Sequence, residues 1–449
     1  MRLKISSLFV CFIHLCILIL VQNVGADDSK KRVFTLEESI SEALVNFSSI
    51  KVKKEAIEGA IAVKNQARSA MLPKFSTTYG YTRLGDVHRL LNVDVGEAFP
   101  VIPRFETNTE ENYQWKVNIE QMIFPLHTLT DYYKITKTRV DASKLDFETE
   151  RLDLALRVKE AYFNVLKADR SLDVTRRAVT QLESHVNEVR DFFEAGIIPV
   201  NDLLKAEVEL ANTKHSMIKA QNGAKLSRSA FNIILSRQIN EPVEVVDILS
   251  YEPIELDFKQ CVDKAFTNRP EMKMIDVNMK GLEKKISLSK YVNYYPKVII
   301  SADYIKAGDS PDVSGSDFHL SESWQATAAL SWTFWQWGKS YYSVSEEKSQ
   351  KRQLIHKRSG LKDTIRFQVK EAILDLEEAK KNIPTTKKAV LQAEENLRVS
   401  NERYENQLTT TTEVLDAQTL LTQARLNYYH SLYDYSLAEA RLQRAMGEY

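Results

Sequence analysis

Two acidic residues near the C-terminus have a spacing that brings their side chains together. Glu413 and Asp416 are three positions apart at the start of a predicted helix over 412–446. Residues three apart are neighbours on a helix surface, so both carboxylates lie on one face, where they could attract cations. Negative charge near a helix N-terminus is also favoured by the helix dipole. Ordinary solvated acids therefore explain the pair as well as a cation site does, and both interpretations stay open.

The rest of the sequence offers no arrangement typical of catalysis or ligand binding. It contains no phosphate-binding loop motif, no serine or cysteine arrangement that recommends itself as a nucleophile, and no cluster with metal-ligand spacing. The eight histidines are scattered, with His185 and His215 on opposite arms of a predicted hairpin. We therefore expect no enzyme, no cofactor and no bound metal. The formal net charge of zero gives no reason to expect nucleic acid as a partner.

The elements that carry these residues occur twice along the chain. With the numbering shifted by 211, residues 157–162 align with 368–373, and residues 202–206 align with 413–417. A repeat of about two hundred residues is far longer than a solenoid unit and predicts two structurally equivalent halves. The expected boundaries are 27–240 for the first repeat, 241–257 for a linker and 258–449 for the second repeat.

The N-terminus is a separate segment. Two basic residues precede an apolar run over 8–21, and small residues lead up to Ala26. This pattern predicts a secretory signal peptide over 1–26, with an uncleaved anchor helix as the alternative. Two of the three cysteines lie inside it, so the mature chain keeps only Cys261 and can form no internal disulfide.

Each repeat is predicted to contain the same elements in the same order. A helix stops at Pro73 or Pro296, and the hydrophobic period then changes from helical to two. The alternation predicts a β-hairpin over 73–124 and another over 296–335, with strands of about ten to thirteen residues, long enough to cross a bilayer when tilted. A heptad pattern then predicts a coiled-coil seam along a very long helix, followed by a return helix. The expected helices are 36–71, 127–195 and 201–236 in the first repeat, and 258–295, 338–406 with a kink at Pro384, and 412–446 in the second.

The four predicted strands cannot form a closed sheet by themselves. An open sheet in lipid leaves unsatisfied backbone groups at its edges, and single-chain barrels begin at about eight strands. If the strands enter a membrane, the chain must therefore assemble with other copies. Two, three or four copies would give eight, twelve or sixteen strands, and this argument does not choose between them. The alternative is an antiparallel sheet packed inside a soluble protein.

The sequence around the two predicted helix turns resembles a known family. Residues 404–417, Tyr-Glu-Asn-Gln-Leu-Thr-Thr-Thr-Thr-Glu-Val-Leu-Asp-Ala, are similar to the helix turn of the TolC-type outer-membrane factors, or outer membrane efflux proteins. Residues 193–206 repeat this turn and contain Gly196, a glycine common at that position. The family forms the exit ducts of efflux pumps and type I secretion systems.

The resemblance implies an α+β fold made mainly of long α-helices. Three copies would form an α-barrel tunnel in the periplasm, continuous with a twelve-stranded transmembrane β-barrel in the outer membrane, with four strands from each chain. The implied function is a passive channel gated at its periplasmic tip, and the implied partners are a periplasmic adaptor protein, an inner-membrane transporter and outer-membrane lipid. A soluble periplasmic coiled-coil scaffold or adaptor is the alternative function.

The resemblance also assigns roles near the two turns. Glu413 and Asp416 fall where some members place acidic residues that ring the tunnel entrance, so a trimer would display six carboxylates that repel one another and bind cations. Tyr404 and Asp202 fall at positions that take part in closing the entrance. The closure is therefore expected at these turns.

One position departs from the pattern of those members. Where they carry an arginine that locks the entrance, this chain has Thr409, so an arginine–aspartate lock cannot form as drawn. Lys205 lies one turn from Asp202 and is a candidate substitute. We expect closure by packing of the tyrosine and by weaker hydrogen bonds. The predicted gate residues are Asp202, Lys205, Tyr404, Thr409, Glu413 and Asp416.

Overall fold

The computed structural model describes residues 32–85, 109–248, 257–291 and 294–449. The predicted signal peptide over 1–26 lies outside these residues, as does part of the predicted linker. The chain divides into two compact units, and each draws on both repeats. The hairpin unit takes its residues from 1–51, 151–265 and 367–449, and the sheet unit from 52–150 and 266–366.

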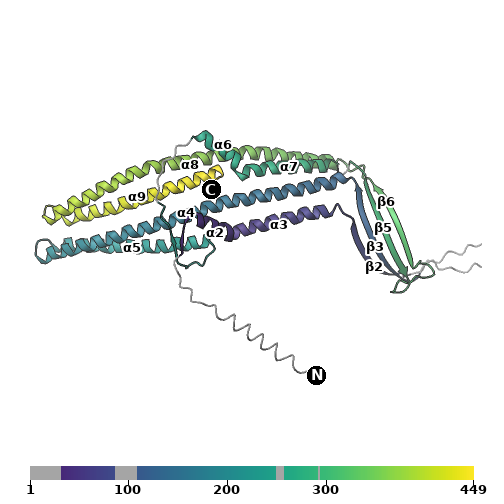
Figure 1. Ribbon diagram of the computed structural model, residues 1–449, viewed down its shortest axis with the longest axis horizontal. Coiled ribbons are helices and arrows are strands. Elements are labelled where there is room, and N and C mark those ends of the chain that lie inside the picture. Colours follow the sequence, from purple (N-terminus) through teal and green to yellow (C-terminus); the bar gives the residue numbers. More distant parts are fainter. Residues whose placement is uncertain (1–31, 86–108, 249–256, 292–293) are drawn as a thin grey trace, which may run out of the picture. The chain divides into compact units, whose positions relative to one another are not determined.

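Two antiparallel helical hairpins make up most of the hairpin unit (Figure 1). The first joins the end of α4 (Leu126–Glu194) to α5 (Val200–Ile234), and the second joins the end of α8 (Lys339–Glu405) to α9 (Thr411–Met446). The very long helices and their return helices are therefore present as predicted. Helix α8 continues through Pro384.

Most of the heptad seam predicted along α4 is buried, although its last member, Phe193, is 36% exposed. Leu172, Val179 and Val186 recur every seven residues and are all less than a tenth exposed. The interleaved Leu182 and Val189 are buried as well. Burying one stripe of apolar side chains is what keeps so long a helix packed, because helical propensity contributes little by comparison.

A short two-stranded sheet ties the linker to the start of the hairpin unit. Strand β1 (Arg32–Phe34) pairs in parallel with β4 (Val243–Val245), which lies in the segment predicted as a linker. The Tyr162 hydroxyl on α4 lies 2.6 Å from the carbonyl oxygen of Val246 and 3.2 Å from that of Phe34. Strands this short carry no clear alternation, so the sequence pattern gave no sign of them.

The predicted helices 36–71 and 258–295 are each two helices, so the single-helix prediction was wrong at both places. The first divides into α2 (Leu36–Asn46) and α3 (Ser48–Ser69), because Phe47 adopts an extended backbone with ψ 136°. The second divides into α6 (Phe258–Asn268) and α7 (Pro270–Tyr291). The second break precedes Pro270, because proline has no amide hydrogen to donate and disfavours the helical conformation in the residue before it.

The sheet unit holds the four predicted strands in one antiparallel sheet of order β2-β3-β5-β6 (Figure 1). Both predicted hairpins form, and pairing between β3 and β5 joins them. None of the described helices is both long and apolar enough to cross a membrane. The strands are β2 (Lys74–Arg83), β3 (Glu111–Phe124), β5 (Lys297–Gly308) and β6 (Glu322–Ser331).

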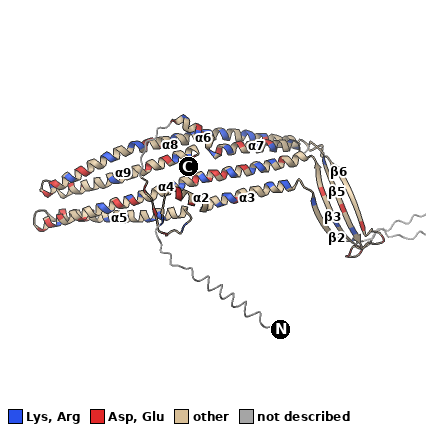
Figure 2. Cartoon of the chain, viewed as in Figure 1, with Lys and Arg blue, Asp and Glu red and all other residues tan. Residues whose placement is uncertain are grey.

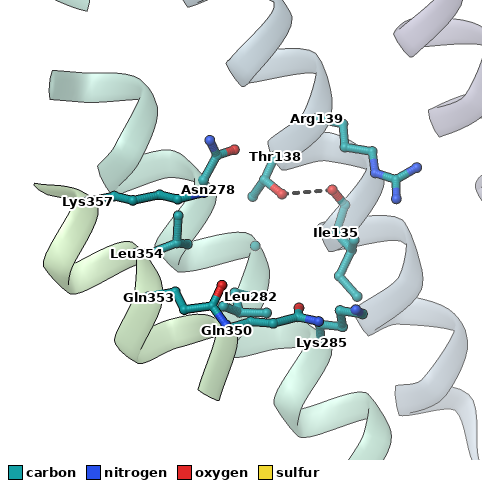
Figure 3. A pocket seen from close by; sticks show the side chains of 11 residues that line it. Ile135, Thr138, Arg139, Asn278, Leu282, Lys285, Gln350, Gln353, Leu354 and Lys357 are labelled. Atoms are coloured by element: carbon teal, nitrogen blue, oxygen red, sulfur yellow. Dashed lines mark hydrogen bonds between the residues drawn. The ribbon is translucent and has the colours of Figure 1, made fainter. Parts of the chain in front are cut away.

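Three helices of the sheet unit meet around a cavity of about 350 Å³ (Figure 3). Its lining includes Gly281 on α7, which lies very close to α4: a Cβ atom added there would be 2.7 Å from the Thr138 hydroxyl oxygen. That hydroxyl donates a hydrogen bond of 2.7 Å to the carbonyl oxygen of Ile135. Glycine at 281 therefore permits the close approach of α7 to α4.

Candidate functional site

The two helix turns have the same hydrogen-bonded geometry. Gly196 and Gln407, which the shift of 211 aligns, both take positive φ, 73° and 60°. In each turn the next residue's amide bonds to the carbonyl five positions back, Ile197 to Phe192 and Leu408 to Arg403. This is the Schellman arrangement that ends a helix. The repeat therefore extends to individual backbone contacts, although one copy uses glycine and the other glutamine.

An apolar cluster packs the two hairpins together just beyond these turns. It contains side chains from all four helices, so it joins the first repeat to the second within one chain. Partly buried Phe192, Ile198, Leu210 and Ala393 pack against it. Its buried members are Val186, Val189, Leu203, Ala206, Leu397, Tyr404, Val414, Ala417 and Leu421.

Tyr404 lies at the centre of this contact and is only 3% exposed. Its ring is 5.1 Å from the His185 ring and 5.6 Å from the Phe192 ring, between centroids. The Thr411 hydroxyl donates a hydrogen bond of 3.2 Å to the Tyr404 hydroxyl. Burial raises the pKa of Tyr404, and the negative charge of nearby Asp202 adds to the increase. Tyr404 is therefore a neutral side chain that connects α8, α9 and α4.

Asp202 and Lys205 form a pair within the first turns of α5. The Lys205 ammonium lies 3.4 Å from the Asp202 carboxylate, in an exposed contact between residues three apart. Such pairs contribute at most a few tenths of a kcal/mol. Asp202 and Lys205, two of the six predicted gate residues, are thus in contact, but the contact is weak.

Thr409 and Glu413 are in direct contact, and Glu413 has a second partner, Arg403, that the sequence did not indicate as a gate residue. The Thr409 hydroxyl donates to the Glu413 carboxylate, and the Arg403 guanidinium lies 3.3 Å from the same carboxylate. Arg403 also donates to the Leu408 carbonyl oxygen across the turn. A basic residue in the last turn of a predicted helix was the available signal, because such residues often bond the final carbonyls.

Asp416 differs from Glu413 in its surroundings. It is exposed and, among the described residues, it makes no hydrogen bond or ion pair. Asp416 and Lys205 line one groove of about 450 Å³ between α5 and α9. The predicted acidic pair therefore consists of one carboxylate held by an arginine and one that is unpaired among the described side chains.

His185 is a second residue that the sequence analysis left without a role. It is 7% exposed, and burial lowers its pKa to about 4. Its Nδ1 atom is 3.6 Å from the Glu188 carboxylate, while its Nε2 atom is buried without a partner among the described residues. The ring is therefore neutral at neutral pH and packs beside Tyr404 as an apolar group.

The charges of the described helices form no patch of one sign. Basic and acidic residues are intermixed along them (Figure 2). Within the described ranges no group of three or more histidine, cysteine or acidic residues could hold a metal ion. Among the described residues, the contacts at the turns are apolar packing, hydrogen bonds and exposed ion pairs that join the two hairpins.

Comparisons with known proteins show the family of the chain. The family model described as "Outer membrane efflux protein" matches residues 39–232 and 261–448. The chain is 20% identical over 403 residues to the outer membrane protein TolC of Vibrio cholerae serotype O1, covering 87% of this chain and 85% of that protein. The two segments matched by the family model, 39–232 and 261–448, lie one in each predicted repeat.

Solved structures share the fold. The CmeC outer membrane channel of Campylobacter jejuni superposes with a TM-score of 0.77 at 16% identity, covering 92% of this chain and 85% of that chain. The open state of the MtrE outer membrane channel of Neisseria gonorrhoeae gives 0.75 at 17% identity, covering 92% and 89%. With a family model matched over most of its length, the chain belongs to the outer membrane efflux protein family and is an outer-membrane efflux channel with a helical periplasmic extension.

Proposed function

We propose that three copies of this chain assemble into a passive duct across the outer membrane. The observation that carries this proposal is the amphipathic sheet of the sheet unit. Its apolar face is exposed, with Phe75 69%, Trp324 80% and Leu330 68% accessible. An exposed apolar face of this size needs a partner of the same character, and lipid provides one.

The edges of the sheet support assembly with other copies. Among the described strands, the outer edges of β2 and β6 have no pairing partner. In lipid each unpaired backbone group costs several kcal/mol, so the sheet must close. Pairing β6 of one copy with β2 of the next closes a barrel, and three copies give twelve strands. The helices of the three copies then continue the passage into the periplasm.

The gate of the duct is proposed to lie at the two helix turns. Tyr404 packs between the hairpins, and the contacts of Asp202 with Lys205 and of Glu413 with Thr409 and Arg403 are weaker and exposed. Opening would separate the hairpins and disrupt the packing of Tyr404. Asp416 is the carboxylate left free to form an acidic ring, so we propose three charges at the entrance rather than six.

The energy for transport is proposed to come from partners. The sequence holds no phosphate-binding loop, so we propose that a periplasmic adaptor couples the turns to an inner-membrane transporter. The groove between α5 and α9 is proposed as part of the adaptor contact, because it lies next to the gate and exposes Leu204 and Val208 beside charged side chains.

Native mass spectrometry of the mature chain released from detergent tests the assembly. We expect a species with the mass of three copies. The same preparation should form channels in planar bilayers. Two or four copies would overturn the trimer but leave closure of the sheet in place. A monomer that retains its sheet without forming channels would overturn the duct itself.

A further inference from the structure

The face of the sheet opposite the apolar face carries a row of polar side chains, one from each strand. Ser76, Asn118, Asp303 and Gln325 lie directly opposite one another in the register of β2, β3, β5 and β6. Successive side chains of a strand point to opposite faces. The row therefore lies on the other side of the sheet from Trp324.

Asp303 is the centre of this row, and its charge is compensated. Its side chain is 5% exposed. The Asn118 amide donates to it at 2.6 Å, the Gln325 amide donates to it at 2.8 Å, and the Lys116 ammonium lies 3.0 Å away. Three donors from two neighbouring strands thus fix the carboxylate, and one lysine neutralises it.

In the duct proposed above, on which this inference rests, the polar row faces the passage because the apolar face meets lipid. Three copies would place three Lys116–Asp303 pairs inside the barrel near the middle of the strands. Charges that line a narrow passage set its preference for cations or anions. A compensated pair gives no preference.

We propose that Lys116 and Asp303 are specificity-determining residues of the channel. Together they keep the passage electrically neutral at the middle of the sheet, so cationic and anionic solutes pass this level equally well. Removing the lysine leaves three fixed carboxylates that attract cations. Removing the carboxylate leaves three lysines that attract anions.

The local potential can be read with a cysteine placed beside the pair. Ser301 is two residues from Asp303 on the same face, about 7 Å along the strand, and Ala302 lies on the opposite face. In a Cys261→Ser background, Ser301→Cys is reacted with a cationic trimethylammonium thiosulfonate and with an anionic sulfonate thiosulfonate of similar size. The protein is the full mature chain in nanodiscs of zwitterionic lipid. The readout is the ratio of the two reaction rates.

In this assay Lys116→Gln is expected to raise the ratio of cationic to anionic rates by about threefold or more, and Asp303→Asn to lower it by a similar factor. The double variant should return close to the parent. The matched control is Lys306→Gln, which removes the same charge from a cross-strand pair with Glu322, 2.8 Å long, on the opposite face. It should leave the ratio unchanged.

Unchanged ratios in both Lys116→Gln and Asp303→Asn would overturn the inference, provided that each variant has the parent's assembly mass. Failure of the duct would look different. Ala302→Cys should be protected from both reagents in lipid, and if it reacts as fast as Ser301→Cys, the apolar face does not meet lipid and the proposed duct fails first.

Discussion

Tyr404 is the residue on which the two hairpins converge, and its neighbour His185 makes the contact sensitive to pH. The imidazole is buried and neutral, with its pKa lowered to about 4 by loss of solvation. An unfolded chain would hold this histidine at an ordinary pKa of about 6.5. Protonation therefore favours the unfolded state in the interval between these values.

The hairpin unit should accordingly lose stability as the pH falls. The contribution of His185 to stability is fully present above pH 6.5 and declines between pH 6.5 and 4, by about 3 kcal/mol, because the unfolded state binds the extra proton. His185→Gln should flatten this decline in thermal unfolding followed by circular dichroism.

The exposed His215 provides the matched control. His215→Gln should retain the parent's pH profile. If His185→Gln declines as steeply as the parent over the same interval, the buried imidazole is not the cause.

At the scale of the elements, the two repeats have kept their turns but have diverged in how closely their helices pack. Gly59 and Gly281 are each the twelfth residue of their helix, α3 in the first repeat and α7 in the second. A Cβ atom at Gly59 would meet nothing within 4 Å, whereas one at Gly281 would be 2.7 Å from the Thr138 hydroxyl. The same residue type therefore has a packing role in only one repeat.

Substitution by alanine should separate these two glycines. Gly59→Ala should stabilise the protein by up to about 1 kcal/mol, because alanine is the better helix former. Gly281→Ala should lose that gain and destabilise, since Thr138 must move and give up its bond to Ile135. Differential scanning fluorimetry in detergent compares the two melting temperatures.

Thr138→Ala tests the cause, because it removes the hydroxyl that the new Cβ would meet. Relative to Thr138→Ala alone, the added Gly281→Ala substitution should be neutral or stabilising. Equal stabilisation by Gly59→Ala and Gly281→Ala in the parent would refute the close packing of α7 on α4.

At the scale of the whole molecule, the proposals concern two levels of the passage. The turns of the hairpin unit carry the proposed gate, and the polar face of the sheet unit carries a neutral row. Selection by charge is therefore expected at the entrance, where Asp416 is unpaired among the described residues, and absent from the middle of the sheet.

The gate makes a prediction for the assembled channel. Tyr404→Ala removes the aromatic contacts with His185 and Phe192 and should raise single-channel conductance severalfold in planar bilayers, since the hairpins lose the packing that holds them together. Asp202→Ala should raise it less, because its pair with Lys205 is weak.

Tyr404→Phe keeps the ring and loses only the hydrogen bond from Thr411, so its conductance should lie between those of the parent and Tyr404→Ala. Unchanged conductance in both Tyr404→Ala and Asp202→Ala would exclude a gate at these turns.

The sequence by itself determined the repeat, the order of the elements and the amphipathic hairpins. These features rest on local periodicity, since a strand alternates every second residue and a helix stripe recurs every three to four. The matching turns were predictable for the same reason. The shift of 211 places Gly196 opposite Gln407 and Phe193 opposite Tyr404.

Only the tertiary structure decided which faces meet. Three contacts depend on how separate elements pack. They are the pairing of β3 with β5, the ion pair of Arg403 with Glu413 and the ring contact of His185 with Tyr404. The break at Phe47 depends on one backbone angle, ψ, that no local pattern specified. A sequence records the period of each element, but the free energy of packing selects among the surfaces that those periods allow.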